Sequence, residues 1–337
     1  MHGWIIIDKP VGPGSTQVVS AVKRALRDGG YGKCKVGHGG TLDPLASGVL
    51  PVAVGEATKL AGRMLDSDKL YDFTITFGVE TDTLDAEGVA VATSDIRPIF
   101  AQVEAVLPQF TGPIDQVPPA YSALKVDGER AYDLARAGEA VLLASRAVTI
   151  YSLHSSPAWG GGPLASCASG EGGEPPALLL GTAPSARCAG PPSRPGEGLE
   201  SVTLTAHVSK GTYIRSLARD IAQALGTVGH VTMLRRTKAG PFDLSQAISL
   251  DKLAELGHAR ALEDKLLPLR AGLDDIPALP LSPDQAGLLR QGRVLIGIAA
   301  DAPVLGDGPY FAMLDDVPVA LVEVQDREVR VVRGFNL

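Results

Sequence analysis

The 337-residue sequence contains few cysteines and no long apolar run. Its three cysteines, Cys34, Cys167 and Cys188, are too few for a disulfide framework, and they lack the CxxC spacing of a zinc site. No apolar run reaches the roughly 18 residues that a membrane span needs. The opening MHGWIIIDKP also lacks the basic region of a signal peptide. We therefore expect a soluble, cytoplasmic protein with free thiols.

Signatures of several enzyme classes are missing as well. The glycine-rich segment 36–48, VGHGGTLDPLASG, is followed by no Gly-Lys-Ser/Thr, so it is not a Walker phosphate loop. The chain has no G-x-S-x-G motif of a lipase-type site. His38 and Asp43 supply at most two metal ligands in this segment. Taken alone, Asp43 before a proline is typical of a turn.

The net charge of −7 argues at first against nucleic acid, but the charges are unevenly distributed. Residues 1–40 carry six Lys/Arg and two Asp, and residues 201–240 carry six Lys/Arg and one Asp. Two basic blocks far apart in sequence are able to form one phosphate-binding face. The alternative is two ordinary solvated surfaces.

The pattern along the chain indicates both strands and helices. We expect strands at 4–7, 71–79, 147–153 and 201–208, helices at 97–108 and 128–138, and a small antiparallel unit within 275–337. We also expect a helix that Ser15 or Thr16 caps and that runs to about Arg27, and a helix over 213–225 that Thr212 caps. The segment ETDTLDAEG reads as a solvated hairpin turn, and the proline-rich stretch 277–283 as a linker.

Residues 157–198 differ from the rest of the chain in composition. They hold 10 Gly and 8 Pro in 42 positions. Such a segment buries too little apolar surface to offset its ordering entropy. We interpret it as a flexible insertion between two adjacent strands; an ordered lid is the alternative.

Arg215 lacks an acidic partner on its own helix. It falls in the first turn of the helix expected at 213–225, where the helix dipole disfavours a cation. None of its neighbours three and four residues away is acidic, and one of them is Arg219. The anion that it needs is a carboxylate from a distant loop or a nucleic-acid phosphate. The alternative is a pair of solvated arginines.

Seven segments between residues 5 and 236 match, in order, the motifs of one known family. They are IIIDKPVG (5–12), VGHGGTLDPLASGVLPVAVGEATKL (36–60), DSDKLYDFTITFG (66–78), TDTLDAEG (81–88), VPPAYSALKVDGERAYDLARAG (117–138), VSKGTYIRSLARDI (208–221) and HVTMLRR (230–236). In these segments the chain resembles the TruB family of tRNA pseudouridine synthases. The insertion 157–198 departs from the family pattern, but it falls between two strands.

The resemblance implies that the chain converts uridine 55 in the T-loop of tRNA into pseudouridine, without metal or cofactor. Asp43 matches the catalytic Asp of G-T-L-D-P, and Arg215 matches the Arg of G-T-Y-I-R that pairs with it. A carboxylate suits the reaction because it can add covalently, stabilise positive charge at ribose C1′ or take a proton. The sequence leaves these three roles open.

The resemblance also assigns five supporting residues. Tyr71 matches the tyrosine that packs on the target base and is proposed to take the C5 proton. A phenol is a poor base at neutral pH, so stacking is the safer expectation. His38 matches a residue that holds the extruded base and its loop, and Tyr213 and Leu234 match residues that line the uridine pocket. Lys9 is expected to give structural support or to contact phosphate.

The fold implied is α+β: a pseudouridine synthase domain over 1–270, interrupted by 157–198, and a small PUA-like RNA-binding β domain over 275–337. The implied partner is the T-arm of tRNA, and we expect a monomer. Two alternatives stay open. One is a guide-dependent pseudouridine synthase that acts on ribosomal RNA, and the other is an RNA-binding tRNA folding helper without catalysis.

Overall fold

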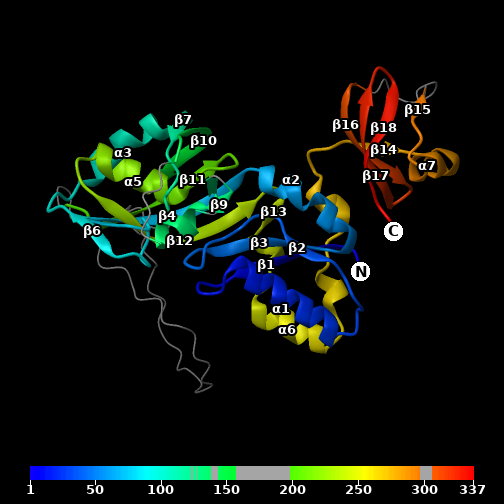
Figure 1. Ribbon diagram of the computed structural model, residues 1–337, viewed down its shortest axis with the longest axis horizontal. Coiled ribbons are helices and arrows are strands. Elements are labelled where there is room, and N and C mark those ends of the chain that lie inside the picture. The colour runs from blue at the N-terminus through cyan, green and yellow to red at the C-terminus, as the bar shows by residue number, and fades with distance from the viewer. Residues whose placement is uncertain (123, 127, 138–142, 157–197, 297–305) are drawn as a thin grey trace, which may run out of the picture.

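The structure, a computed structural model, describes residues 1–122, 124–126, 128–137, 143–156, 198–296 and 306–337. Within these residues, a nine-stranded sheet organises the larger unit and a five-stranded sheet organises a smaller C-terminal unit (Figure 1). Helices pack beside the larger sheet, so the architecture is α+β, as expected.

The larger unit contains most of the elements. Its main strands are β1 (Gly3–Lys9), β2 (Val36–His38), β3 (Ser47–Val54), β4 (Lys69–Phe77), β7 (Gly112–Gln116), β10 (Arg146–Ser155), β11 (Ser201–Val208), β12 (Gly229–Ala239) and β13 (Phe242–Asp243). Two hairpins are formed by β5 (Val79–Thr81) with β6 (Ala90–Thr93) and by β8 (Lys125–Val126) with β9 (Glu129–Arg130). The helices are α1 (Ser15–Asp28), α2 (Ala61–Asp66), α3 (Phe100–Val106), α4 (Ala131–Arg136), α5 (Ile214–Ala224) and α6 (Leu250–His258). Short 3-10 helices are η1 (Gly55–Leu60), η2 (Leu107–Phe110), η3 (Leu244–Gln246), η4 (Leu262–Lys265) and η5 (Leu269–Gly272).

The larger sheet runs in the order β1-β3-β12-β4-β11-β10-β7, with β2 on β3 and β13 on β12. Strands from distant parts of the sequence therefore lie side by side at its centre. The strands β10 and β11 are antiparallel neighbours, with Leu153 opposite Ala206. The expectation of a flexible insertion between them falls on residues 157–197, which lie outside the described part of the chain.

Two hydrophobic cores cover the opposite faces of this sheet. In β1, Ile5 and Ile7 belong to one core, and Trp4 and Ile6 belong to the other, as the two-residue period of a strand requires. The run Trp-Ile-Ile-Ile is thus apolar at every position because both faces of β1 are buried. α1, α5 and α6 contribute buried side chains to the first core, and α1 and α6 lie side by side (Figure 1).

The N-terminal caps of α1 and α5 differ from those expected. The N-cap of α1 is Gly14, whose N–H donates to Oε1 of Gln17 at 2.8 Å, rather than Ser15 or Thr16. Ser15 is buried instead and bonds to Leu42 in the loop ahead of β3. The Ser15 hydroxyl, which the local pattern predicts as the helix cap, therefore makes a long-range contact with Leu42 instead.

In α5 the N-cap is Tyr213, because the Thr212 hydroxyl donates back to the Ser209 carbonyl at 3.0 Å. The apolar face behaves as predicted. Ile214, Leu217 and Ile221 are buried against the first core.

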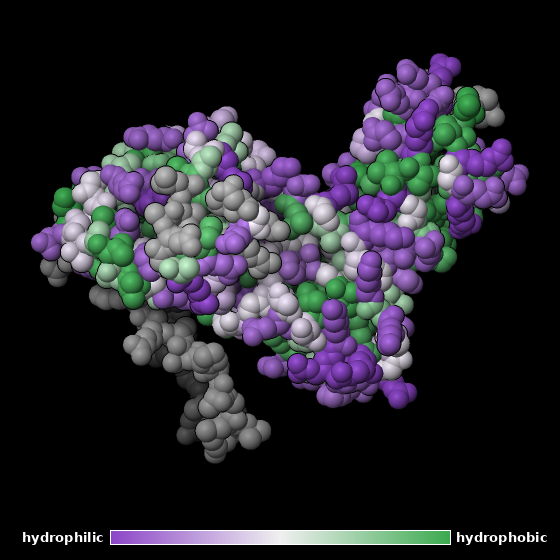
Figure 2. Space-filling model, viewed as in Figure 1, coloured by the Kyte–Doolittle hydropathy of each residue, from purple (hydrophilic) through white to green (hydrophobic). Residues whose placement is uncertain are grey.

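The smaller unit consists of β14 (Ala278–Pro280), α7 (Pro283–Arg290), β15 (Leu295–Ile296), β16 (Gly308–Leu314), β17 (Val317–Gln325) and β18 (Glu328–Gly334). The expectation that 277–283 is a linker is wrong, because β14 pairs with β16 and Leu279 is buried in the core of this unit. The proline in β14 is accommodated because β14 is an edge strand. The unit stands out from the rest of the surface in Figure 2.

Phe311, Met313 and Phe335 of the smaller unit join Trp4 and Phe242 in the second core of the larger one. The two units therefore share a hydrophobic interface. Among the described residues, no helix is long and apolar enough to cross a membrane.

Candidate active site

Asp43 and Arg215, which lie 172 positions apart in sequence, form an ion pair. Nη2 of Arg215 donates to Oδ2 of Asp43 at 2.9 Å. The side chain of Arg215 is 8% exposed, whereas that of Asp43 is 44% exposed. The guanidinium is thus a buried anchor, and the carboxylate that it holds remains open to a substrate. The anion that Arg215 lacks on its own helix is a carboxylate of a distant loop, as the resemblance implies.

Arg215 connects three segments around this carboxylate. Besides Asp43, it pairs with Asp85 at 3.2 Å, and the Asp85 side chain is only 5% exposed. Its Nη1 donates to the Thr83 carbonyl at 2.8 Å, and its Nη2 donates to the Tyr121 carbonyl at 3.0 Å. The glycine-rich loop, the β5–β6 turn and the chain after β7 therefore meet at one guanidinium.

The interpretation of ETDTLDAEG as a solvated turn is wrong at Asp85. This carboxylate accepts hydrogen bonds from the Thr83 hydroxyl at 2.6 Å and the Glu87 N–H at 3.1 Å, besides its pair with Arg215. Sequence reasoning missed Asp85 as a site residue, and the only signal was its place in TDTLDAEG. Arg219, the like-charged neighbour of Arg215 on α5, pairs with its sequence neighbour Asp220 at 2.8 Å.

Lys9 lies beneath the loop that carries Asp43. Its side chain is fully buried, and Nζ donates to the carbonyls of Pro10 at 2.9 Å, Pro13 at 2.8 Å and Pro44 at 3.3 Å. Burial lowers the pKa of Lys9 to about 8, although the Asp43 carboxylate acts in the opposite direction. Of the two roles expected for Lys9, the geometry favours structural support, because its donors already have partners.

Tyr213 precedes Arg215 on the same turn and is held by Gln116. The buried Gln116 amide accepts from the Tyr213 N–H at 2.8 Å and donates to the Tyr213 carbonyl at 3.1 Å. Burial raises the pKa of the Tyr213 phenol, and the nearby Asp43 carboxylate acts in the same direction. The main chain of Tyr213 is therefore fixed beside the ion pair, and its phenol is neutral at pH 7.

Tyr71, Leu234 and His38 lie on strands that border the loop. Tyr71 on β4 is half-buried at the margin of the first core, opposite Arg236, and Leu234 on β12 is buried in the same core. His38 on β2 accepts the Gly40 N–H at its Nδ1 at 3.4 Å. Burial lowers the pKa of His38, so its ring is neutral at pH 7. Their roles toward a bound base stay predictions.

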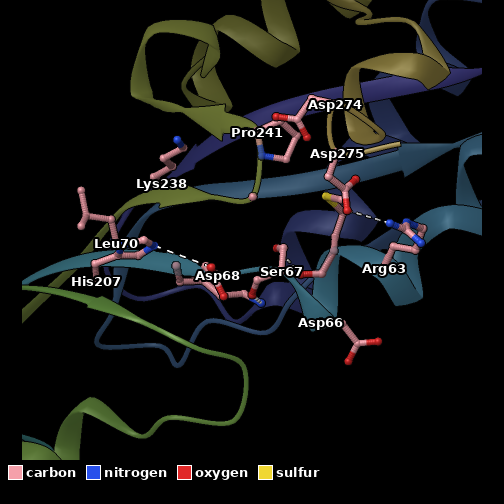
Figure 3. A pocket seen from close by; sticks show the side chains of 13 residues that line it. Arg63, Asp66, Ser67, Asp68, Leu70, His207, Lys238, Pro241, Asp274 and Asp275 are labelled. Atoms are coloured by element: carbon pink, nitrogen blue, oxygen red, sulfur yellow. Dashed lines mark hydrogen bonds and ion pairs between the residues drawn. The ribbon is translucent and has the colours of Figure 1, made fainter. Parts of the chain in front are cut away.

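A separate cavity of about 710 Å³ is bordered by residues of α2, β4 and β12 (Figure 3). Leu70 and His207 line it, and they are the strand neighbours of Tyr71 and Ala206, so their side chains leave the opposite face of the sheet. Asp68 faces His207 at 3.9 Å in this cavity. The cavity is therefore distinct from the cluster around Asp43.

Within the described ranges, no group of three or more His, Cys, Asp or Glu side chains is arranged to hold a metal ion. The reactive group of the cluster is the accessible Asp43 carboxylate, which is paired with the buried Arg215 guanidinium. An ionised, accessible carboxylate can attack an electrophilic carbon or stabilise positive charge that develops beside it.

Comparison with known proteins places these residues in a family. A sequence model described as TruB family pseudouridylate synthase (N-terminal domain) matches residues 28–158, and one described as tRNA pseudouridylate synthase B C-terminal domain matches residues 215–274. The tRNA pseudouridine synthase B of Novosphingobium aromaticivorans is 61% identical over 337 residues, which cover 100% of this chain and 98% of that protein. The protein of the same name from Zymomonas mobilis is 54% identical, covering 100% of this chain and 96% of that protein.

The fold comparison agrees with the sequence comparison. A chain of a solved Cbf5–Nop10–Gar1 complex is 25% identical and superposes with a TM-score of 0.65, covering 99% of this chain and 85% of that chain. The larger unit thus has the pseudouridine synthase fold, and the smaller unit is a five-stranded β domain, consistent with the PUA-like domain that the resemblance implies. With a relative that is 61% identical over the whole of this chain, the chain belongs to the TruB family of pseudouridylate synthases.

Proposed function

We propose that this chain isomerises uridine to pseudouridine in tRNA, at position 55 of the T-loop. The observation that carries the proposal is the ion pair in which buried Arg215 holds the accessible Asp43 carboxylate at 2.9 Å. The names of its relatives, tRNA pseudouridine synthase B, support tRNA as the substrate.

The reaction needs a carboxylate rather than a proton donor at its centre. The bond between ribose C1′ and uracil N1 breaks, the uracil turns, and C1′ bonds to C5. The proton on C5 leaves and N1 takes up a proton, so that substrate and product are isomers. Ionised Asp43 serves either by adding covalently or by stabilising positive charge at C1′.

The target base must first leave the stack of the T-loop, which costs a few kcal/mol. Stacking on an aromatic side chain returns about 1–3 kcal/mol per base. We assign Tyr71 to this stacking, Tyr213 and Leu234 to the walls of the base pocket, and His38 to the loop beside it. The neutral His38 ring suits a hydrogen bond to an uncharged base.

We also propose the domain roles. Residues 1–270 form the catalytic domain, and residues 275–337 form an RNA-binding domain that contacts tRNA outside the T-loop. The basic residues of 1–40 and 201–240, apart from the buried Lys9, Arg215 and Arg236, supply contacts to the tRNA backbone, because such contacts position the RNA without reading its sequence. The active species is a monomer.

Incubation of the pure protein with an unmodified tRNA transcript, followed by mapping of pseudouridine, tests the proposal. We expect pseudouridine at position 55 without a guide RNA, and no product from a transcript with cytidine at that position. The variant Asp43→Asn should keep its tRNA affinity and lose product formation entirely, because the amide can neither add at C1′ nor stabilise charge there.

Each alternative gives a different result in the same experiment. A guide-dependent enzyme leaves the naked transcript unmodified, and a folding helper binds tRNA but forms no pseudouridine. If Asp43→Asn still forms pseudouridine at the wild-type rate, Asp43 is not the catalytic residue.

A further inference from the structure

Arg236 is a buried cation with an unusual set of partners. Its residue is 1% exposed, and no ion pair joins it to a carboxylate within the part of the chain that the structure describes. Its donors go instead to three main-chain carbonyls. Nε donates to Val49 at 2.8 Å, Nη1 to Thr41 at 3.3 Å and Nη2 to Gly40 at 3.2 Å. A charge buried without a counter-charge is costly, so its contacts call for an explanation.

The three carbonyls lie on both sides of Asp43 in the sequence. Gly40 and Thr41 precede it in the glycine-rich loop, and Val49 follows it in β3. A guanidinium presents its donors in a rigid planar fork, unlike the flexible ammonium of lysine. One side chain thus sets the spacing between the two ends of the segment that carries Asp43.

The main chain of Arg236 holds the same segment. Arg236 lies opposite Gly48 of β3, and a Cβ at Gly48 would come within 2.1 Å of the Arg236 carbonyl oxygen. Gly48 also has φ of +102°, which favours glycine. On its other side, Arg236 lies opposite Tyr71 of β4. The residue therefore connects the strand of Tyr71 to the loop of Asp43.

We propose that Arg236 is a positioning residue for the catalytic carboxylate. Its fork holds the segment from Gly40 to Val49 so that Asp43 meets Arg215 and faces the substrate, and Arg236 itself touches no substrate. This inference rests on the proposed function for its kinetic consequence, but not for its effect on the loop.

The test compares Arg236→Lys and Arg236→Gln with a matched control, Arg97→Gln. Arg97 also donates to main-chain carbonyls, those of Ser94 at 2.8 Å and Ile96 at 3.3 Å, and it lies outside the site. Three quantities are measured: the single-turnover rate at saturating tRNA transcript, the tRNA Kd by filter binding, and hydrogen exchange of the peptide covering 39–49.

For Arg236→Gln we expect a rate loss of about 100-fold, because a displacement of about 1 Å at a reacting group costs that much. For Arg236→Lys we expect a loss of about tenfold, since one ammonium cannot span carbonyls on both sides of Asp43. Both variants should exchange faster in 39–49, while their tRNA Kd stays within about threefold of wild type. Arg97→Gln should change none of the three quantities.

A wild-type rate in folded Arg236→Gln, or a rise in Kd with an unchanged rate, overturns the proposal. If Arg236→Gln does not fold, Arg236→Lys decides, since it keeps the buried charge: an unchanged rate and exchange would refute the positioning role. If the wild type forms no pseudouridine, the proposed function fails. Exchange in 39–49 then tests whether Arg236 holds the loop, and unchanged exchange overturns this inference separately.

Discussion

A single guanidinium serves two carboxylates that differ in exposure. Arg215 contacts Asp43, which is 44% exposed, and Asp85, which is 5% exposed. The exposed carboxylate is available to a substrate, and the buried one is not. Asp85 therefore acts through Arg215, because its hydrogen bonds fix where the guanidinium lies and thus where Asp43 is held.

The variant Asp85→Asn should show this indirect role. Removing one charge of a buried pair leaves the partner partly uncompensated, so we expect the free energy of unfolding to fall by about 3 kcal/mol. The rate of pseudouridine formation should fall on the order of 10- to 100-fold as Arg215 shifts. Urea denaturation and single-turnover kinetics measure the two effects.

Glu87→Gln is the matched control, because Glu87 lies in the same turn but is exposed. We expect it to change stability by less than about 0.5 kcal/mol. If both variants behave alike, the buried pair between Asp85 and Arg215 does not support the site.

Lys9 gives the stability a pH dependence with a defined sign. Burial lowers its pKa from 10.5 to about 8 in the folded protein. Between these two values the unfolded chain binds more protons, so the free energy of unfolding gains a contribution as pH rises above about 8. That contribution to the free energy of unfolding is complete above pH 10.5, the ordinary pKa of lysine, and it is lost as the pH falls through the folded-state pKa of about 8.

The prediction is tested by comparing wild type with Lys9→Met in urea, at about pH 7 and about pH 10. Groups that titrate in both proteins cancel in the difference. We expect the advantage of wild type to be larger at the higher pH by on the order of 2 kcal/mol. An equal difference at the two pH values would show that Lys9 has an ordinary pKa.

At the level of elements, α1 is connected to the loop of Asp43 by one side chain. The Ser15 hydroxyl donates to the Leu42 carbonyl at 3.0 Å and accepts the Leu42 N–H at 2.8 Å. Both groups of Leu42 are thereby satisfied in a buried place, where an unmade hydrogen bond is costly. The first turn of α1 thus supports the site rather than its own cap.

Ser15→Ala should lower the free energy of unfolding by about 1–3 kcal/mol, because it leaves the Leu42 main chain unpaired. Ser20→Ala is the control on the same helix, since its exposed hydroxyl only donates to Thr16 one turn earlier. That variant should stay within about 0.5 kcal/mol of wild type. Equal effects in urea denaturation would argue against the connection.

At the level of the whole molecule, the larger and the smaller unit are joined through apolar side chains and the C-terminal segment. Phe335 is buried and packs edge-to-face on Phe311, with ring centroids 5.8 Å apart. Nearby, Lys59 donates to the Gly334 carbonyl at 2.8 Å, and the Asn336 N–H donates to Glu56 at 2.8 Å. We expect the units to unfold together.

Phe335→Ala should destabilise this interface by about 3–5 kcal/mol, the usual cost of removing a buried phenyl ring. Thermal unfolding followed by calorimetry should show one transition in wild type and a lower Tm in the variant. Val332→Ala, at an exposed apolar position, should leave Tm nearly unchanged. Two resolved transitions in wild type would contradict the joined interface.

Much of the fold was predictable because it depends on local patterns. The strand expected at 201–208 has those bounds in the structure, and the apolar face of α5 is buried as its three- and four-residue spacing indicates. The missed features depend on partners that lie far away in the sequence. The Ser15 hydroxyl bonds to Leu42 instead of capping α1, and the proline-rich stretch 277–283 contributes an edge strand to a sheet.

The sequence by itself determined which segments alternate polar and apolar residues, which face of α5 is apolar, and which motifs mark the family. These features depend on residues that are close in the sequence. Only the tertiary structure decided that Asp85 is buried beneath Arg215 and that Lys9 and Arg236 hold the loop of Asp43 through its carbonyls. The physical reason is that the environment of a charge is set by groups brought close in space. For Arg236 one of those groups, the Gly40 carbonyl, lies 196 positions away in the sequence.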